Sequence, residues 1–182
     1  MTEKTVAAWV SVLEASYLVL PVPCFHHNLG KRLVKRPKLY FWDTGLACHL
    51  TGVRSRELLE RGPLAGALFE NYVVAEVAKD AAHHGLDRRL YHARTNAGIE
   101  ADFVLEDLER RRIVFGEVTR RSTVRPDDAR SLRVLREASR DMLREGWTVE
   151  TMIVTTGDAD ESLPDDTIVR GIETGLPVIP AG

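Results

Sequence analysis

The order of apolar segments between residues 64 and 156 constrains the fold of this chain more than any other feature. The expected elements are a long, largely buried helix, three strands, an amphipathic helix and a last strand, at 64–84, 89–94, 99–107, 112–118, 127–144 and 151–156. Short turns between the three strands predict antiparallel pairing, whereas the helix before the last strand predicts a parallel crossover. The sequence therefore predicts an α/β fold with a mixed sheet flanked by helices.

The N-terminal residues predict a smaller unit. Residues 5–15 place Val6, Trp9, Val10 and Leu13 at helical spacing, so we expect an amphipathic helix with Trp9 in a core rather than stacked on a base. A strand at 17–22 and a strand-like Leu-Tyr-Phe-Trp at 39–42 follow, and two short segments over 44–61 are helix-like. One helix and a hairpin bury little surface, so this part resembles half of a domain that leans on something else.

Charge is distributed unevenly along the chain. The formal net charge is −2, but residues 1–144 carry 24 basic and 19 acidic residues, whereas residues 145–182 carry eight acidic residues and one basic residue, Arg170. The basic first part permits nucleic-acid contact without requiring it. Residues 157–166 predict an exposed acidic loop, which suits a protein-binding segment, an intramolecular mask for the basic surface, or plain solvation.

Several function classes are disfavoured by what the sequence lacks. No apolar run approaches the ~18 residues of a membrane helix and no signal peptide is evident, so we expect a cytoplasmic protein without membrane contact. No phosphate-binding loop is present, so we expect no nucleotide site and no ATP hydrolysis on this chain. A zinc site is disfavoured because the candidate ligands have irregular spacing; they are Cys24, His26, His27, Cys48 and His49.

Carboxylates on neighbouring strands form the strongest candidate site. Glu100 and Asp102 alternate with apolar residues in the middle strand, and Glu117 lies near the end of the next strand. If the strands pair through the 107–111 turn, Asp102 and Glu117 fall roughly opposite one another, within reach of one hard cation. Oxygen ligands of this type suit Mg²⁺ or Mn²⁺ and metal-assisted phosphodiester hydrolysis. The alternative is a set of solvated surface acids, or acids paired with nearby arginines.

Two basic clusters are candidate nucleic-acid contacts. The first is a loop of five cations within eight residues, namely Lys31, Arg32, Lys35, Arg36 and Lys38. It suits phosphate contact, and equally a solvated or ATPase-facing loop. The second is an arginine stripe on the helix after residue 127, made of Arg130, Arg133, Arg136, Arg140 and Arg144. This stripe is more typical of the wet face of an amphipathic helix than of a nucleic-acid groove.

Several strings in the chain are similar to a known family. They are GALFENYVVAEV, LYHARTNAGIEADFVLED, GEVTRRSTVRPDD and, most specifically, KRLVKRPKLYFWDTGL. They resemble the uncharacterised C-terminal domain found after AAA-type ATPase modules in bacteria and archaea, which is similar to the PD-(D/E)XK restriction-endonuclease fold. The resemblance implies a partial winged-helix segment at 1–52, a nuclease-like domain at 53–182, and an ATPase module upstream or in trans.

The resemblance also implies roles for individual residues. The nuclease-like motif falls on Glu70 in the first core helix, Asp102 on the second strand and Glu117 on the third, with Asp102 and Glu117 as the metal ligands. The usual lysine of this motif is Thr119 here, which cannot stabilise developing negative charge as an ammonium does. Arg121, two residues further along, is a candidate electrostatic partner, although its guanidinium is a poor activator of water.

Three hypotheses about function follow. The first is metal-dependent action on nucleic acid, which the retained carboxylates favour. The second is a non-catalytic module that binds DNA or a protein and lends specificity to an ATPase, which Thr119 favours. The third is a fragment without independent activity, which self-associates through the exposed helix at 5–15.

Overall fold

The computed structural model describes residues 2–25, 36–83 and 88–174. Its helices are α1 (Glu3–Ala15), α2 (Thr44–Leu50), α3 (Arg56–Arg61), α4 (Ala65–His83), η1 (Pro126–Ala129), α5 (Arg130–Ala138), α6 (Arg140–Arg144) and η2 (Ile172–Thr174), where η denotes a 3-10 helix. Its strands are β1 (Val19–Val22), β2 (Lys38–Phe41), β3 (Arg88–Arg94), β4 (Glu100–Asp107), β5 (Arg112–Val118), β6 (Thr148–Thr155), β7 (Asp160–Ser162) and β8 (Ile168–Gly171).

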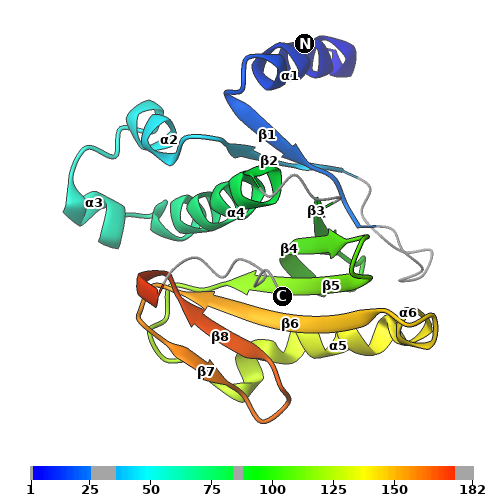
Figure 1. Cartoon of the computed structure of the whole chain (residues 1–182). Helices are drawn as coiled ribbons and strands as arrows, with labels where there is room; N and C mark the ends of the chain where they lie inside the picture. Colours follow the sequence, from blue (N-terminus) through cyan, green and yellow to red (C-terminus); the bar gives the residue numbers. More distant parts are fainter. Residues whose placement is uncertain (1, 26–35, 84–87, 175–182) are drawn as a thin grey trace.

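Six of these strands form one mixed sheet in the order β3-β4-β5-β6-β8-β7. Strands β3, β4 and β5 pair antiparallel through short turns, and β5 pairs parallel with β6 across the connection formed by η1, α5 and α6. The predicted mixed sheet, its hairpins and its crossover are therefore confirmed. The structure places helices on both faces of this sheet (Figure 1).

The acidic segment after β6 is not the plain exposed loop that the sequence predicts. It forms β7, which pairs antiparallel with β8, and β8 pairs parallel with β6. The reason lies just beyond the acidic run, because Thr167 and Val169 are fully buried and draw this part of the chain back onto the sheet. The side chains of β7 itself are exposed, so the polarity of the segment was interpreted correctly and its backbone pairing was missed.

Helix α4 covers one face of the sheet. Its buried residues Val73, Val74 and Val77 pack with Phe103 of β4 and Val114 of β5. The helix begins at Ala65, two residues after Pro63, and its length agrees with the buried helix predicted for this part of the chain. This packing fixes the first turns of α4 over the start of β4, where the candidate carboxylates lie.

Helix α5 covers the opposite face. Leu132 and Leu135 are fully buried against Val104, Phe115 and Ile153 of the three central strands. Gly116 of β5 lies beside Phe103, whose ring atoms come within 2.0 Å of the position that a Cβ at residue 116 would take. A side chain at residue 116 would therefore displace the Phe103 ring, so this point of the sheet requires glycine.

The N-terminal segment forms helix α1 and an antiparallel pair of strands, β1 and β2. Figure 1 shows α1 beyond this pair, on the far side from the six-stranded sheet. Trp9 is 60% exposed, so the expectation that it lies in a core is wrong, because within the described residues α1 has few neighbours other than β1. The pair itself is anchored, since Val22 and Tyr40 belong to the same core cluster as α4.

Candidate functional site

One lysine joins two of the predicted carboxylates. The Lys38 Nζ atom lies 2.9 Å from Glu70 Oε1 and 3.1 Å from Asp102 Oδ1. Lys38 is the first residue of β2, Glu70 lies in the second turn of α4, and Asp102 lies near the start of β4. All three side chains are half-buried, with exposed fractions of 17–29%. The structure thus brings together residues from three elements that are 32 and 64 positions apart in the chain. We call these three residues the Lys38 cluster.

Tyr40, on the same strand as Lys38, adds a hydrogen bond to the Lys38 cluster. Its hydroxyl donates a hydrogen bond of 2.7 Å to Glu70 Oε1, the same oxygen that contacts Lys38. Residues 38 and 40 are two positions apart in a strand, so their side chains lie on one face of β2. Burial, together with the charge of Glu70, raises the pKa of Tyr40 far above its usual range, so the phenol remains a hydrogen-bond donor.

A β-bulge explains why the Asp102 side chain faces Lys38 and Glu70. The register between β3 and β4 pairs Tyr91 with Val104 but Ala93 with Ala101, so β4 carries one extra residue between these points. The ladder between β4 and β5 ends at the pair Phe103 and Gly116. In place of a further backbone bond, Asp102 Oδ2 accepts a hydrogen bond of 3.0 Å from the backbone N–H of Val118. The bulge therefore turns Asp102 toward α4 and β2.

The pKa of Asp102 is raised, even though this carboxylate has two donors. Burial contributes most to the rise and the charge of Glu70 adds to it, while Lys38 and the N–H of Val118 act in the opposite direction. The pKa of Lys38 is also raised: burial lowers it, but the charges and hydrogen bonds of Asp102 and Glu70 outweigh that effect. The ammonium is therefore held in its charged form by the carboxylates that it bridges.

Glu117 lies near this cluster but faces the other side of the sheet. Ile113 and Phe115, two and four positions earlier in β5, pack in the core under α5, so alternation directs Glu117 to the same face. There it borders a hollow of about 170 Å³ together with Thr119, Arg121 and Asp128. Burial raises the pKa of Glu117 to about 7, and the charges of Asp102 and Asp128 add to the rise. Its Oε2 atom is buried and has no hydrogen-bond partner among the described residues.

Thr119 and Arg121 are less engaged with the carboxylates. The backbone N–H of Thr119 donates to the carbonyl oxygen of Val154, which continues the line of β5 by one residue. The Arg121 side chain is 67% exposed and pairs with Asp128 at 2.5 Å. Arg121 thus borders the same hollow as Glu117, but its ion pair is with Asp128, a partner that the sequence did not suggest.

The arrangement suits a divalent cation in part. Burial is the main cause of the raised pKa values of Asp102 and Glu117, the negative charge of neighbouring carboxylates adds to both, and the Oε2 atom of Glu117 has no hydrogen-bond partner among the described residues. Within the described ranges, however, no three His, Cys, Asp or Glu side chains are grouped so that they could hold a metal ion. A cation held by Asp102 and Glu117 would therefore take its other ligands from water and from a substrate phosphate, as Mg²⁺ commonly does.

The structure describes only two of the five basic residues predicted to form a phosphate-binding loop, Arg36 and Lys38. Lys31, Arg32 and Lys35 lie outside the described residues, and Arg36 is exposed. Lys38, which was grouped with them as a phosphate contact, is instead held by Glu70 and Asp102. The sequence did offer one indication of this difference, because Lys38 and Tyr40 share one face of a short strand whose other face is apolar.

The arginine stripe on α5 and α6 is in part tied to the acidic segment. Arg133 pairs with Asp165 at 3.2 Å, and Arg136 donates to the carbonyl oxygen of Asp165. This contact agrees with the intramolecular mask, one of the three interpretations of the acidic segment. Of the candidate zinc ligands that the structure describes, Cys24 is buried beside β3, whereas Cys48 and His49 lie on α2. His26 and His27 lie outside the described residues.

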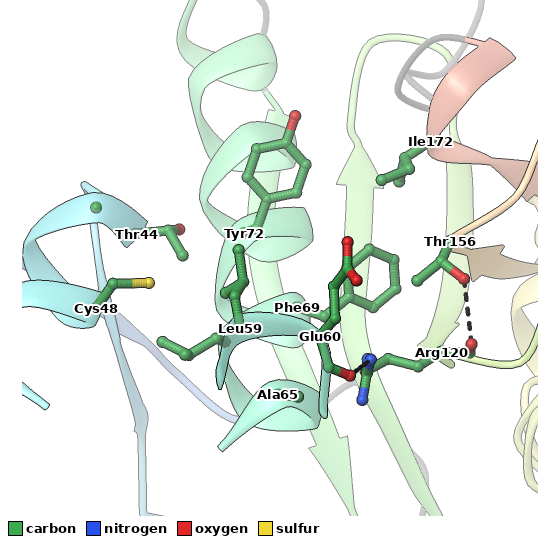
Figure 2. Close-up of a pocket in the computed structure, with 12 residues that line it drawn as sticks. Thr44, Cys48, Leu59, Glu60, Ala65, Phe69, Tyr72, Arg120, Thr156 and Ile172 are labelled. Atoms are coloured by element: carbon green, nitrogen blue, oxygen red, sulfur yellow. Dashed lines mark hydrogen bonds between the residues drawn. The ribbon is translucent and has the colours of Figure 1, made fainter. Parts of the chain in front are cut away.

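A separate cavity of about 640 Å³ lies between α2, α3 and α4 and the ends of β5 and β6 (Figure 2). Its lining is mostly apolar, with Leu59, Phe69 and Ile172 among the residues labelled in the figure. At its rim, Arg120 donates to the backbone oxygen of Glu60, and the Thr156 hydroxyl donates to the backbone oxygen of Arg120. None of the carboxylates of the Lys38 cluster lines this cavity.

The fold and this cluster define an α/β protein with a carboxylate and lysine site beside the sheet. Residues 65–174 match the domain of unknown function DUF4143, and residues 1–57 match the domain of unknown function DUF8612. The first match covers more than half of the chain, so the chain belongs to the DUF4143 family. The two matches leave residues 58–64 between them, and the sequence predicts a domain boundary after residue 52.

Two curated relatives are similar over most of this chain. The uncharacterized protein Rv2008c of Mycobacterium tuberculosis and the uncharacterized protein Mb2031c of Mycobacterium bovis are each 34% identical over 133 residues. That stretch is 73% of this chain but 28% of each relative, so the chain corresponds to a small part of their length. No solved structure matches the chain. Among the residues that the structure describes, no helix is long and apolar enough to cross a membrane.

Proposed function

We propose that this chain is a nuclease-like domain that acts on nucleic acid through a divalent cation bound by Asp102 and Glu117. The single observation that carries the proposal is the pairing of Glu70 of α4 and Asp102 of β4 on Lys38, with Glu117 of the neighbouring strand near enough for the charge of Asp102 to raise its pKa. One oxygen of Glu117 is buried and has no hydrogen-bond partner among the described residues. Groups of acids with raised pKa values are typical of functional sites rather than of solvated surfaces. The order of helix, three strands, helix and strand supports the PD-(D/E)XK fold as part of this proposal.

The proposed reaction is the hydrolysis of a phosphodiester. The oxygen of a water molecule bonds to phosphorus, one phosphorus–oxygen ester bond breaks, and the departing oxygen gains a proton from that water. The cation would supply a Lewis acid for the phosphate oxygens and lower the pKa of the water. Asp102 and Glu117 would hold the cation, with Glu70 as the supporting carboxylate and Arg121, which borders the Glu117 hollow, as the electrostatic partner.

The setting of this activity is also a proposal. The curated relatives are more than three times as long as the stretch that they share with this chain. We propose that an AAA-type ATPase module acts with this domain, either on the same polypeptide or in trans, and that residues 1–52 contribute part of a winged helix. In this setting the basic residues Lys31, Arg32, Lys35 and Arg36 supply contacts to nucleic-acid phosphates that weaken as salt rises.

Cleavage of plasmid and single-stranded DNA with Mn²⁺ or Mg²⁺ tests the proposal. We expect cleavage by the natural chain, its loss on chelation, and a fall of at least about 100-fold for Asp102→Asn. Asp141→Asn is the matched control, because it makes the same chemical change on the exposed surface of α6. Equal activity in the natural chain and Asp102→Asn would reject the site.

A second function has its own supporting observation. Both oxygens of Asp102 already have donors, Lys38 and the N–H of Val118, as in a structural cluster. A non-catalytic module that binds DNA or a protein partner would need no more than this. Fluorescence anisotropy with labelled DNA at two salt concentrations separates the functions, because this module would bind without cleaving under any metal condition.

A further inference from the structure

We infer that Lys38 supplies the positive charge of the candidate site, which the uncharged Thr119 cannot supply. The packing of the β1–β2 strand pair positions Lys38 beside Glu70 and Asp102. This inference rests on the proposed function and extends it, because it assigns a positioning residue outside the stretch that matches DUF4143. Residues 1–57 and 65–174 match different domains of unknown function, so the site is shared between the two matched segments.

The contacts of Lys38 support this role. Its ammonium touches both Glu70 and Asp102 within 3.1 Å, and Tyr40 from the same strand holds the shared oxygen of Glu70. A salt bridge on an open surface leaves its lysine free to move, whereas this side chain is only 26% exposed and meets two carboxylates at once. Lys38 therefore fixes the orientation of the Asp102 carboxylate relative to Glu70.

No other described cation makes the same contacts. Thr119 occupies the position of the motif lysine and is uncharged, and Arg121 is turned to Asp128. Among the residues that the structure describes, the ion pairs of Asp102 and Glu70 are both with Lys38. The positive charge of Lys38 also acts to lower the pKa of Glu117, although burial and nearby carboxylates outweigh it.

The position of Lys38 is set by the packing of the strand pair. Lys38 pairs with Val22 across β1 and β2, and Val22 is fully buried in the core under α4. Tyr40, 5% exposed, packs in the same cluster. Asn71 of α4 adds two hydrogen bonds to the backbone of Phe41, at 2.7 and 3.0 Å, so α4 holds β2 directly. The strand that carries the ammonium and the helix that carries Glu70 are thus fixed to each other.

Five variants test the inference: Lys38→Met, Lys38→Arg, Thr119→Lys, the double variant K38M/T119K, and the control Lys79→Met. Lys79 also pairs with a glutamate on α4, at 2.5 Å from Glu76, but lies away from the cluster. We expect Lys38→Met to lower metal-dependent DNA cleavage by about 100-fold, in the range for loss of one electrostatic donor. Lys38→Arg should keep most of the activity, and K38M/T119K should recover at least about tenfold, while Lys79→Met matches the natural chain.

Rescue separates a role in the reaction from a structural one. A lysine at residue 119 stands on a different strand and restores none of the packing of Lys38, so it rescues only if positive charge at the site is what was lost. Full activity in Lys38→Met, or a loss that K38M/T119K leaves unchanged, overturns the inference.

A second readout needs no activity and distinguishes the failure of the two proposals. We expect Lys38→Met to lower Tm by about 4–8 °C because Asp102 loses its partner, while Lys38→Arg stays close to the natural chain. If every variant is inert toward DNA but this pattern of Tm holds, the nuclease proposal fails and Lys38 remains the cation of the site. If Lys38→Met melts like Lys79→Met, the inference fails whatever the activity.

Discussion

The sequence predicts an amphipathic helix at both α1 and α5, but the two helices differ in what covers their apolar residues. In α5 the apolar stripe is buried on the sheet, with Leu132 at 0% and Leu135 at 1% exposure. In α1 the stripe is open, with Val6 at 40% and Trp9 at 60% exposure. Figure 1 shows the reason: α5 lies along the face of the six-stranded sheet, whereas α1 stands beyond the β1–β2 pair.

This difference teaches that periodicity identifies an apolar face but not what covers it. Burial of a leucine side chain contributes about 1.5–3 kcal/mol, and α5 gains this contribution more than once. Helix α1 forms from its own capping and spacing, with Thr2 accepting a hydrogen bond from the N–H of Thr5, but gains little burial within the described chain. The four predictions below test this contrast.

The largest effect is expected for Leu132→Ala on α5. The substitution removes a fully buried side chain and leaves a cavity under the sheet, so the free energy of unfolding should fall by about 3 kcal/mol. Urea denaturation followed by circular dichroism measures it. A loss below about 1 kcal/mol would mean that α5 packs loosely and that the two helices differ less than their exposures indicate.

Val22→Ala asks whether the N-terminal segment shares the stability of the sheet. Val22 is fully buried with α4 residues although it lies in β1, next to the exposed α1. We expect a loss of about 2 kcal/mol in a single cooperative transition, from the removal of two methyl groups and the cavity they leave. A separate early transition, seen by different probes, would show instead that the strand pair unfolds independently of the sheet.

Glu117→Gln tests whether burial on the α5 side of the sheet raises the pKa of the Glu117 carboxylate. The folded pKa of about 7 lies above the ordinary 4.5, so ionisation opposes folding, and the natural chain loses stability as pH rises from 4.5 through 7. At pH 8 the variant should be more stable by about 1 kcal/mol, a figure reduced for solvent screening. The gap should close below pH 4.5, where glutamate is neutral in both states. A constant gap across the same pH series would refute the assignment.

The smallest effect is expected for Trp9→Ala on α1. Since Trp9 is 60% exposed, the free energy of unfolding should change by less than about 0.5 kcal/mol, as for an ordinary surface residue. Denaturation at several protein concentrations measures it. A large loss that grows with concentration would show that α1 is covered by self-association, and sedimentation velocity would then detect the oligomer.

Much of the fold could be predicted because its signals are local. The helix at α4, the strands β3 to β6 and the crossover were all expected from apolar periodicity and turn residues near their observed positions. The pairing of β7 and β8 could not be predicted, because the acidic residues of β7 predict a loop and its partner is set by the burial of Thr167 and Val169.

The candidate site was predicted in part. The sequence and a family resemblance pointed to Glu70, Asp102 and Glu117. In the structure Glu70 and Asp102 both form ion pairs with Lys38, and Glu117 lies nearby. Lys38 itself was expected to contact phosphates, because its neighbours in the sequence are basic. Its contacts depend on a bulge in β4 and on the packing of β2 against α4, and neither feature has a local signature.

By itself the sequence determined the class of fold, the order of its elements and the presence of acids on neighbouring strands, because these follow from spacing within a few residues. Only the tertiary structure decided that α1 is uncovered, that Asp102 and Glu117 face different sides of the sheet, and that Lys38 closes the space between Glu70 and Asp102. The physical reason is that burial, charge pairing and pKa values depend on groups brought together from distant parts of the chain.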